Sequence, residues 1–311
     1  MWTTSRPLLR LRHTRCPKPH SLLLQRHDSI DVLHRPRWSS GSAHLQLLQH
    51  RHVVGQGPGG IVDYGAVEAM QEELRAEFLA FKGMVPGPNA QPPRPHLLSF
   101  ESMPTFTLGR RQEQLDAGQS SRLERELAVD LTRRRQPVRA SLQPQVRKTN
   151  RGGLTTYHGP GQLVLWPILD MHSPLYPSFG VASYASHLET TTQRLLAQLF
   201  GIETFTTRDE PGVWVQTAPG EQMRKIAAMG VHHRRHVTAL GIAVNIDVPV
   251  TGDEHVNPWA RFVPCGLEGK AVTSVAAELG RDADGAWWNV ADLATCWAKI
   301  FEEGLLDSSK R

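Results

Sequence analysis

Two kinds of hydrophobic spacing follow one another along this chain, and their order most constrains its fold. Apolar residues at helical spacing predict helices at 64–81, 183–199 and 290–305, and a short helix at 273–279. Short apolar runs between them predict strands at 44–48, 96–108, 163–169, 213–216, 226–231 and 237–246. Because the helices separate groups of strands instead of alternating with single strands, we expect an α+β fold, with helices flanking a mixed or largely antiparallel sheet.

Polar stretches between these elements are predicted to be loops. Residues 83–95 are rich in Pro and Gly, which break regular structure. Residues 110–146 are rich in Arg and Gln, and we expect a loop there with one short helix at 123–129.

The positive charge of the chain is concentrated at its start. Of the 35 Lys and Arg and 30 Asp and Glu residues, positions 1–42 hold eight basic and two acidic ones, so the remainder carries a net charge of −1. A nearly neutral remainder argues against nucleic-acid binding. Residues 1–42 have the Arg-rich composition, free of acids until Asp28, of a mitochondrial transit peptide, and the alternative is a basic tail without targeting function. Residues 43–311 are predicted to form a single catalytic domain.

Neither a membrane span nor a metal site is expected from the sequence. Every apolar run is shorter than the ~18–20 residues that cross a bilayer. His232, His233 and His236 lie close together, but Arg234 and Arg235 lie between them, so a solvated turn or strand edge is expected in place of a metal site.

The three cysteines, Cys16, Cys265 and Cys296, do not suggest a disulfide framework. Cys16 falls in the basic leader, and Cys296 falls within the last predicted helix, where a core position is expected. Cys265 stands between Pro264 and Gly266, so it is predicted to lie in a turn that exposes its sulfur. The alternative is that it fills a small apolar space, which is the common fate of a free cysteine.

Two further segments could take part in chemistry. The run from Arg151 to Gln162 contains four glycines, which allow the backbone to approach a ligand, beside Arg, Thr, Tyr and His donors. No GK[ST] sequence follows, so it is not a phosphate-binding loop. Lys225 opens an apolar strand, and taken alone such a lysine most often reaches out into solvent.

Several motifs together resemble the octanoyl (lipoyl) transferase family. The string RGGLTTYHGPGQLVLWPILDM is similar to the family signature, and KIAAMGV, HVTALGIAVNI and VPCGLEGKAVTSVAAELG follow in the family's order. VDYGAVEAMQ and LLSFESMPTFTLGRR resemble the first helix of the family and the strand after it. The resemblance covers roughly residues 43–280, and several independent motifs in order make it specific.

This resemblance implies the fold of biotin and lipoate protein ligases and an acyltransferase activity. An octanoyl or lipoyl group would pass from an acyl-carrier-protein thioester to Cys265, activated by Lys225, and then to a lysine of a lipoyl domain. The implied acceptors are the 2-oxoacid dehydrogenases and the glycine cleavage H protein, and the transfer is the first step of protein lipoylation. The resemblance implies no cofactor and no metal, a monomer, and a location in the mitochondrial matrix.

The resemblance also implies a set of substrate-binding residues. They are Arg151, Gly152, Gly153, Leu154, Thr155, Thr156, Tyr157, His158, Ala228, Met229, Gly230, Gly241, Ile242 and Ala243. Leu163, Val164 and Ile226 are candidates for the wall of an acyl groove, although they could equally belong to the core. The chain departs from the family at Leu240, where a His is common, and in the long intervals 215–224 and 247–261, which are expected to be surface loops.

Other functions remain open from the residues. An ATP-dependent lipoate or biotin ligase on the same fold would need no cysteine nucleophile. A non-enzymatic carrier- or RNA-binding module would use the Gly/Arg segment for contacts and would leave Cys265 buried. A cysteine protease lacks the expected His/Asn context.

Overall fold

The structure is a computed structural model, and it describes residues 46–85, 87, 89–132, 137–216, 218, 220–262, 271–280 and 289–307. The predicted transit peptide therefore lies outside the described residues. Among the described helices, none combines the length and the hydrophobicity that a bilayer crossing requires.

A mixed sheet forms the centre of the described domain. Its strands are, in spatial order, β1 (Gln49–His52), β2 (His96–Phe100), β8 (Gln162–Ile168), β11 (Val237–Asn245), β10 (Arg224–Arg234) and β12 (Ala271–Val272), with β9 (Gly212–Val215) also paired to β10. The pairs β1–β2 and β10–β12 are parallel, and the other pairs are antiparallel. The predicted α+β class with a mixed sheet is confirmed.

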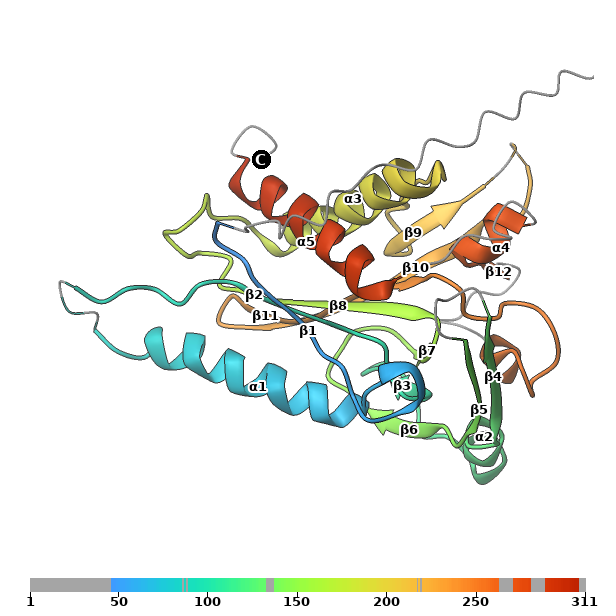
Figure 1. Cartoon of the computed structure of the whole chain (residues 1–311). Coiled ribbons are helices and arrows are strands. Elements are labelled where there is room, and N and C mark those ends of the chain that lie inside the picture. The colour runs from blue at the N-terminus through green and yellow to red at the C-terminus, as the bar shows by residue number, and fades with distance from the viewer. Residues whose placement is uncertain are drawn as a thin grey trace, which may run out of the picture. The chain divides into compact units, whose positions relative to one another are not determined.

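Helices cover both faces of this sheet (Figure 1). Helix α1 (Tyr64–Phe81) packs on one face, where Val67 and Phe78 join a cluster with strand residues such as Val164. Helices α3 (Val181–Phe200) and α5 (Val290–Leu306) pack together on the other face over a larger cluster. Alternate strand residues contribute to the two clusters, because successive side chains of a strand point to opposite faces.

Smaller elements stand beside the main sheet. Strands β6 (Gln145–Lys148), β3 (Thr105–Leu108) and β7 (Thr155–His158) form a second sheet, and β4 (Leu127–Leu131) pairs with β5 (Val138–Leu142). The remaining elements are helices α2 (Ala117–Leu123) and α4 (Val275–Leu279) and the 3-10 turns η1 (Pro58–Gly60) and η2 (Pro258–Arg261). Phe106 on β3, Tyr157 on β7 and Trp259 on η2 belong to a third buried cluster, which we call the lower cluster.

The helix predictions at 64–81, 183–199, 273–279 and 290–305 are confirmed to within a few residues by α1, α3, α4 and α5. The strand predictions at 163–169, 213–216, 226–231 and 237–246 correspond to β8, β9, β10 and β11, and β10 extends beyond its prediction at both ends.

Three sequence predictions were wrong. The first strand lies at 49–52 instead of 44–48, because the polar residues of β1 pair with β2 at the edge of the sheet. The predicted strand 96–108 is two strands of different sheets, β2 and β3, separated at 101–104. Residues 110–146 contain helix α2, strands β4 and β5 and the beginning of β6, and no helix spans 123–129. These strands are short, and the polar residues around them conceal the alternation of β4, in which Leu127, Val129 and Leu131 are buried.

Candidate functional site

A small cavity lies against the face of the main sheet that α1 covers. Its lining comes from α1, β7, β8, β10, β11 and the turn before β7. The lining residues are Tyr64, Arg151, Thr156, His158, Val164, Trp166, Ala228, Met229, Gly230, Leu240, Gly241, Ile242 and Ala243. The cavity has a volume of about 30 Å³. A space of this size holds ordered water, and an alkyl chain would need side chains to move aside.

Strand geometry divides the predicted binding segment 151–158 into two sets. Thr156 and His158 line the cavity, whereas Tyr157 turns the other way and packs on Phe106 and Trp259 in the lower cluster. Thr155 donates its hydroxyl to the side chain of Gln112 at 2.7 Å, away from the cavity. Gly152, Gly153 and Leu154 form the preceding turn and do not line the cavity.

Arg151 is the charged residue of the cavity wall. Its guanidinium is buried and donates hydrogen bonds to the backbone oxygen and hydroxyl of Thr107 and to the oxygen of Gly152. Its aliphatic part lies across Gly230, where a Cβ atom would stand 2.8 Å from Cδ of Arg151. A glycine at this position on β10 therefore gives the arginine its place beside the cavity.

Gly241, on the neighbouring strand β11, allows the backbones of β11 and β8 to approach each other closely. A Cβ atom at Gly241 would lie 2.2 Å from the backbone oxygen of Leu165 on β8. Its neighbours Ile242 and Ala243 also line the cavity, as do Ala228 and Met229 opposite them. The side chains of Met229 and Ile242 pack against the cluster under α3 and α5, because successive residues of a strand face opposite sides of the sheet.

Leu240, the position where the family commonly has His, has an unusual backbone. Its φ is +60°, in the left-handed region that costs a non-glycine residue about 1 kcal/mol or more. The buried side chain of Gln71 on α1 accepts a hydrogen bond from the Leu240 backbone N–H at 2.6 Å. Helix α1 therefore holds the cavity wall in this conformation through one amide group.

A β-bulge decides which way Lys225 faces. The pairing of β10 with β9 shifts between Lys225 and Ala227, so that Lys225 opposes Trp214 while Ala227 opposes Val213. Ile226, Ala227 and Val213 all belong to the cluster under α3 and α5. The extra residue thus turns Lys225 to the face that Ala228 and Gly230 use to line the cavity.

Lys225 is buried at the end of β10, contrary to the usual place of a strand-end lysine. Only 7% of it is exposed, and its ammonium lies 4.5 Å from the centre of the Trp214 ring. The ammonium also donates to the backbone oxygen of Pro211 at 3.3 Å. A carbonyl oxygen and an aromatic face are both partners that suit a cation.

Cys265, the predicted nucleophile, lies outside the described residues, which stop at Phe262 and resume at Ala271. The flanks of this gap converge on one region: Phe262 and Val272 both pack against the lower cluster. Val272 pairs with Lys225 in the parallel β10–β12 ladder, and Thr273 N–H donates to the backbone oxygen of Lys225 at 3.0 Å.

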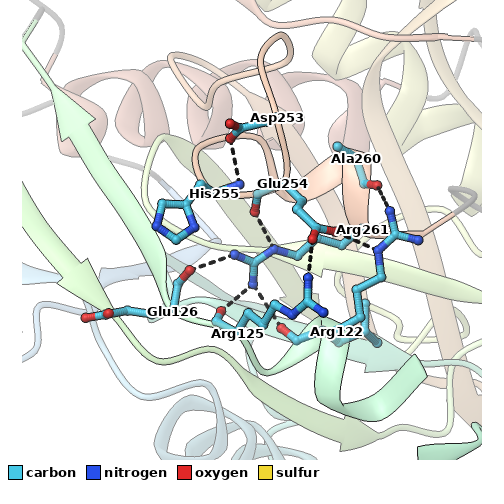
Figure 2. A network of polar contacts seen from close by, with 9 residues as sticks. Arg122, Arg125, Glu126, Asp253, Glu254, His255, Ala260 and Arg261 are labelled. Carbon is cyan, nitrogen blue, oxygen red and sulfur yellow. Dashed lines mark hydrogen bonds and ion pairs between the residues drawn. The ribbon is translucent and has the colours of Figure 1, made fainter. Parts of the chain in front are cut away.

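The residue before Phe262 is held by an unusually complete set of hydrogen bonds (Figure 2). Arg261 is 2% exposed, and its guanidinium donates to the backbone oxygens of Leu123, Arg125, Glu126 and Glu254. Thus the second part of interval 247–261, expected to be a surface loop, includes buried residues such as Trp259 and Arg261.

Sequence reasoning missed two aromatic residues of the cavity. Tyr64, the first residue of α1, stacks on His158 with ring centres 5.4 Å apart, and Trp166 packs edge-on against Tyr64. Both resembled ordinary core positions in the sequence. Of the three suggested wall residues, Val164 lines the cavity, whereas Leu163 and Ile226 belong to the core on the other face.

Known proteins are similar in sequence to this chain over most of the domain. The family description of the lipoyl protein ligase A/B catalytic domain matches residues 69–291, and the chain belongs to that family. The probable octanoyltransferase of Schizosaccharomyces pombe is 32% identical over 218 residues, which cover 69% of this chain and 80% of that protein. The resemblance to octanoyltransferases is thereby confirmed, and the chain is an enzyme of the acyltransferase class.

Two further similarities were found. A Danio rerio protein named octanoyl-(acyl-carrier-protein):protein N-octanoyltransferase LIPT2, mitochondrial, is 37% identical over 186 residues, covering 60% of this chain and 68% of that protein. The crystal structure of P. falciparum LipL1 with lipoate is similar at a TM-score of 0.49 and 11% identity, covering 83% of this chain and 61% of that one.

Proposed function

We propose that this enzyme transfers an octanoyl or lipoyl group from an acyl-carrier-protein thioester, through Cys265, to a lysine of a lipoyl domain. The observation that carries the proposal is the buried ammonium of Lys225, turned by a bulge to the cavity face of β10. The Danio rerio relative is named for the same donor and reaction. The implied acceptors are the lipoyl domains of 2-oxoacid dehydrogenases and the glycine cleavage H protein.

Chain connectivity supports a meeting of Cys265 and Lys225. Cys265 is three residues after Phe262 and six before Ala271 in the sequence. Ala271 pairs with Arg224, the neighbour of Lys225. The ammonium would favour the thiolate of Cys265, because an opposite charge stabilises the ionised form.

The reaction has two half-reactions. The thiolate of Cys265 attacks the carrier thioester, a new C–S bond forms, the bond to the carrier sulfur breaks, and the carrier thiolate takes a proton from the Lys225 ammonium and leaves as its thiol. The amine of the acceptor lysine then attacks octanoyl-Cys265 and gives its proton to the neutral Lys225 amine, so an amide forms, the C–S bond breaks and the Cys265 sulfur is released as the thiolate. Backbone N–H groups of the glycine-rich segment 151–161 or of Gly266 are the candidate donors to the oxyanion.

Binding of the acyl chain requires movement in the cavity wall, because the cavity of about 30 Å³ cannot hold eight carbons. Each methylene that then enters the groove contributes about 0.8 kcal/mol.

Mass spectrometry without ATP tests this function. With octanoyl-carrier protein as the donor, we expect one octanoyl mass on Cys265 and, after a lipoyl domain is added, transfer of that mass to a lysine of the domain. Cys265→Ala should lose both signals, and Cys296→Ala should keep both. Transfer by Cys265→Ala that depends on ATP and free octanoate would instead establish a ligase.

The leader and the site of action complete the proposal. Residues 1–42 are proposed to be a transit peptide that directs a monomeric enzyme to the mitochondrial matrix, and the Danio rerio relative is named as mitochondrial. A fluorescent protein fused behind residues 1–42 should enter mitochondria, and a diffuse signal would contradict the targeting.

A further inference from the structure

One peptide group connects the half-buried carboxyl group of Glu189 with the ammonium of Lys225. Glu189 belongs to α3, the helix that packs against β9 (Figure 1). Its Oε1 accepts a hydrogen bond from the backbone N–H of Gly212 at 2.8 Å. The backbone oxygen of Pro211 accepts a hydrogen bond from Nζ of Lys225 at 3.3 Å. This oxygen and the Gly212 N–H belong to the same peptide group.

The planarity of that peptide group links its two hydrogen bonds. The bond between Pro211 and Gly212 is trans, and in a trans peptide the N–H and the C=O point to opposite sides. A group that holds the N–H therefore also directs the oxygen. The carboxyl group of Glu189 lies at the positive end of this peptide dipole and the ammonium of Lys225 at its negative end, so both contacts are favourable.

The backbone of Gly212 is in a conformation that few residues can adopt. Its φ is +130°, which side chains disfavour. A Cβ atom at Gly212 would stand 2.5 Å from the backbone oxygen of Ala227 and 3.5 Å from Cε of Lys225. The stem of the lysine thus lies along Gly212, and Glu189 holds this peptide in place from a neighbouring helix.

The charges of Glu189 and Lys225 act on each other across the peptide. Burial raises the pKa of Glu189, while the hydrogen bond from Gly212 and the charge of Lys225 oppose that rise. Removing a carboxyl group from water costs free energy unless it is paired. The two interactions that favour the ionised form of Glu189 are therefore the Gly212 N–H and the cation that the same peptide contacts.

We infer that Glu189 is a positioning residue for Lys225, because its carboxyl group holds the Pro211–Gly212 peptide so that the Pro211 oxygen is directed at the ammonium. The catalytic importance of this position rests on the function proposed above. The Trp214 ring, 4.5 Å from Nζ, restrains the ammonium from a second side. The sequence gives no sign of this role, since Glu189 resembles any polar residue of an amphipathic helix.

Titration of Lys225, followed by NMR of labelled lysine side chains, tests the inference without any assay of activity. The signal that is absent from Lys225→Met identifies the residue. Glu189→Gln removes the charge but keeps an oxygen for Gly212, and Glu189→Leu removes both. The pKa of Lys225 should fall by up to about one unit in Glu189→Gln and further in Glu189→Leu, because each change weakens an interaction of the charged form. Glu73→Gln, at an exposed position on α1, is the matched control and should leave it unchanged.

The kinetics of octanoyl transfer to a lipoyl domain give a second readout. Glu189→Leu should lower kcat by about 10- to 100-fold, as expected when a catalytic group is misplaced. KM should change by less than about threefold, because Glu189 does not line the cavity. Glu189→Gln keeps the acceptor oxygen, so its kcat should stay within about fivefold of the native value.

Three results would overturn the inference. They are a Lys225 pKa that is the same in the native protein and in both Glu189 variants, a native kcat in Glu189→Leu, and equal losses of kcat in Glu189→Gln and Glu189→Leu. If the native enzyme transfers no octanoyl group, the proposed function fails, and the titration of Lys225 still decides whether Glu189 acts on its ammonium.

Discussion

Lys225 faces Trp214 directly across the β10–β9 pair, with its ammonium 4.5 Å from the centre of the indole ring. We expect this pair to set the reactivity of Cys265. Replacing Lys225 by Met should slow alkylation of the Cys265 thiol at pH 7 by about tenfold for each unit by which its pKa rises. Trp214→Leu should have a smaller effect, about two- to tenfold, since a cation–π contact contributes about 0.5–1 kcal/mol or somewhat more when buried.

Cys296 provides an internal control for that measurement. It lies half-buried on α5, and burial raises the pKa of its thiol. Its slow alkylation, followed by peptide mass spectrometry, should be the same in the native protein and in both variants. Equal Cys265 rates in native protein and Lys225→Met would refute the role of the ammonium.

Acid should destabilise the protein through the half-buried His50. His50 on β1 is bonded to the Ser99 hydroxyl at 2.8 Å, and burial, with a smaller effect of His52, lowers its pKa from 6.5 to about 4. The folded state therefore resists protonation that the unfolded chain accepts, so this stability is complete above pH 6.5 and is lost as the pH falls toward 4. Urea unfolding at several pH values should show that His50→Gln flattens this dependence and that His255→Gln, an exposed control, does not.

We expect the guanidinium of Arg261, four residues before Cys265 in the sequence, to contribute strongly to the free energy of unfolding. Arg261→Lys keeps the charge but cannot reach all four backbone oxygens, and each buried oxygen left unpaired costs about 1–3 kcal/mol. We expect a loss of about 2–4 kcal/mol in the free energy of unfolding, measured in urea. Arg139→Lys, whose side chain is 73% exposed, should change it by less than about 0.5 kcal/mol. A similar value for both variants would contradict this prediction.

Glu302 on α5 should define where the folded domain begins. Its buried carboxylate accepts hydrogen bonds from the backbone N–H groups of Gln46, Leu47 and Leu48. Glu302→Gln should lower the unfolding free energy by about 1–3 kcal/mol, while Glu303→Gln at the exposed neighbouring position should have little effect. A chain starting at residue 43 should be as stable as the full chain, and one starting at residue 49 should lose the contribution of Glu302.

The sequence by itself determined the long helices, the α+β class and the family. The amphipathic helix 64–81 repeats its apolar spacing over about five turns. A motif such as RGGLTTYHGPGQ can be compared with a family from the sequence alone. Short-range signals of this kind need no knowledge of neighbouring elements.

Tertiary structure alone decided which of these residues meet. The bond of the Leu240 backbone to Gln71 and the burial of the Arg151 guanidinium against Thr107 depend on residues distant in sequence, and the β-bulge after Lys225 depends on the pairing of β10 with β9. The short strands β4 and β5 were missed for a different reason: they pair with each other, but they lie in a polar stretch whose composition predicts a loop. Local composition cannot encode such contacts, since their free energy appears only when the strands and α1 have packed.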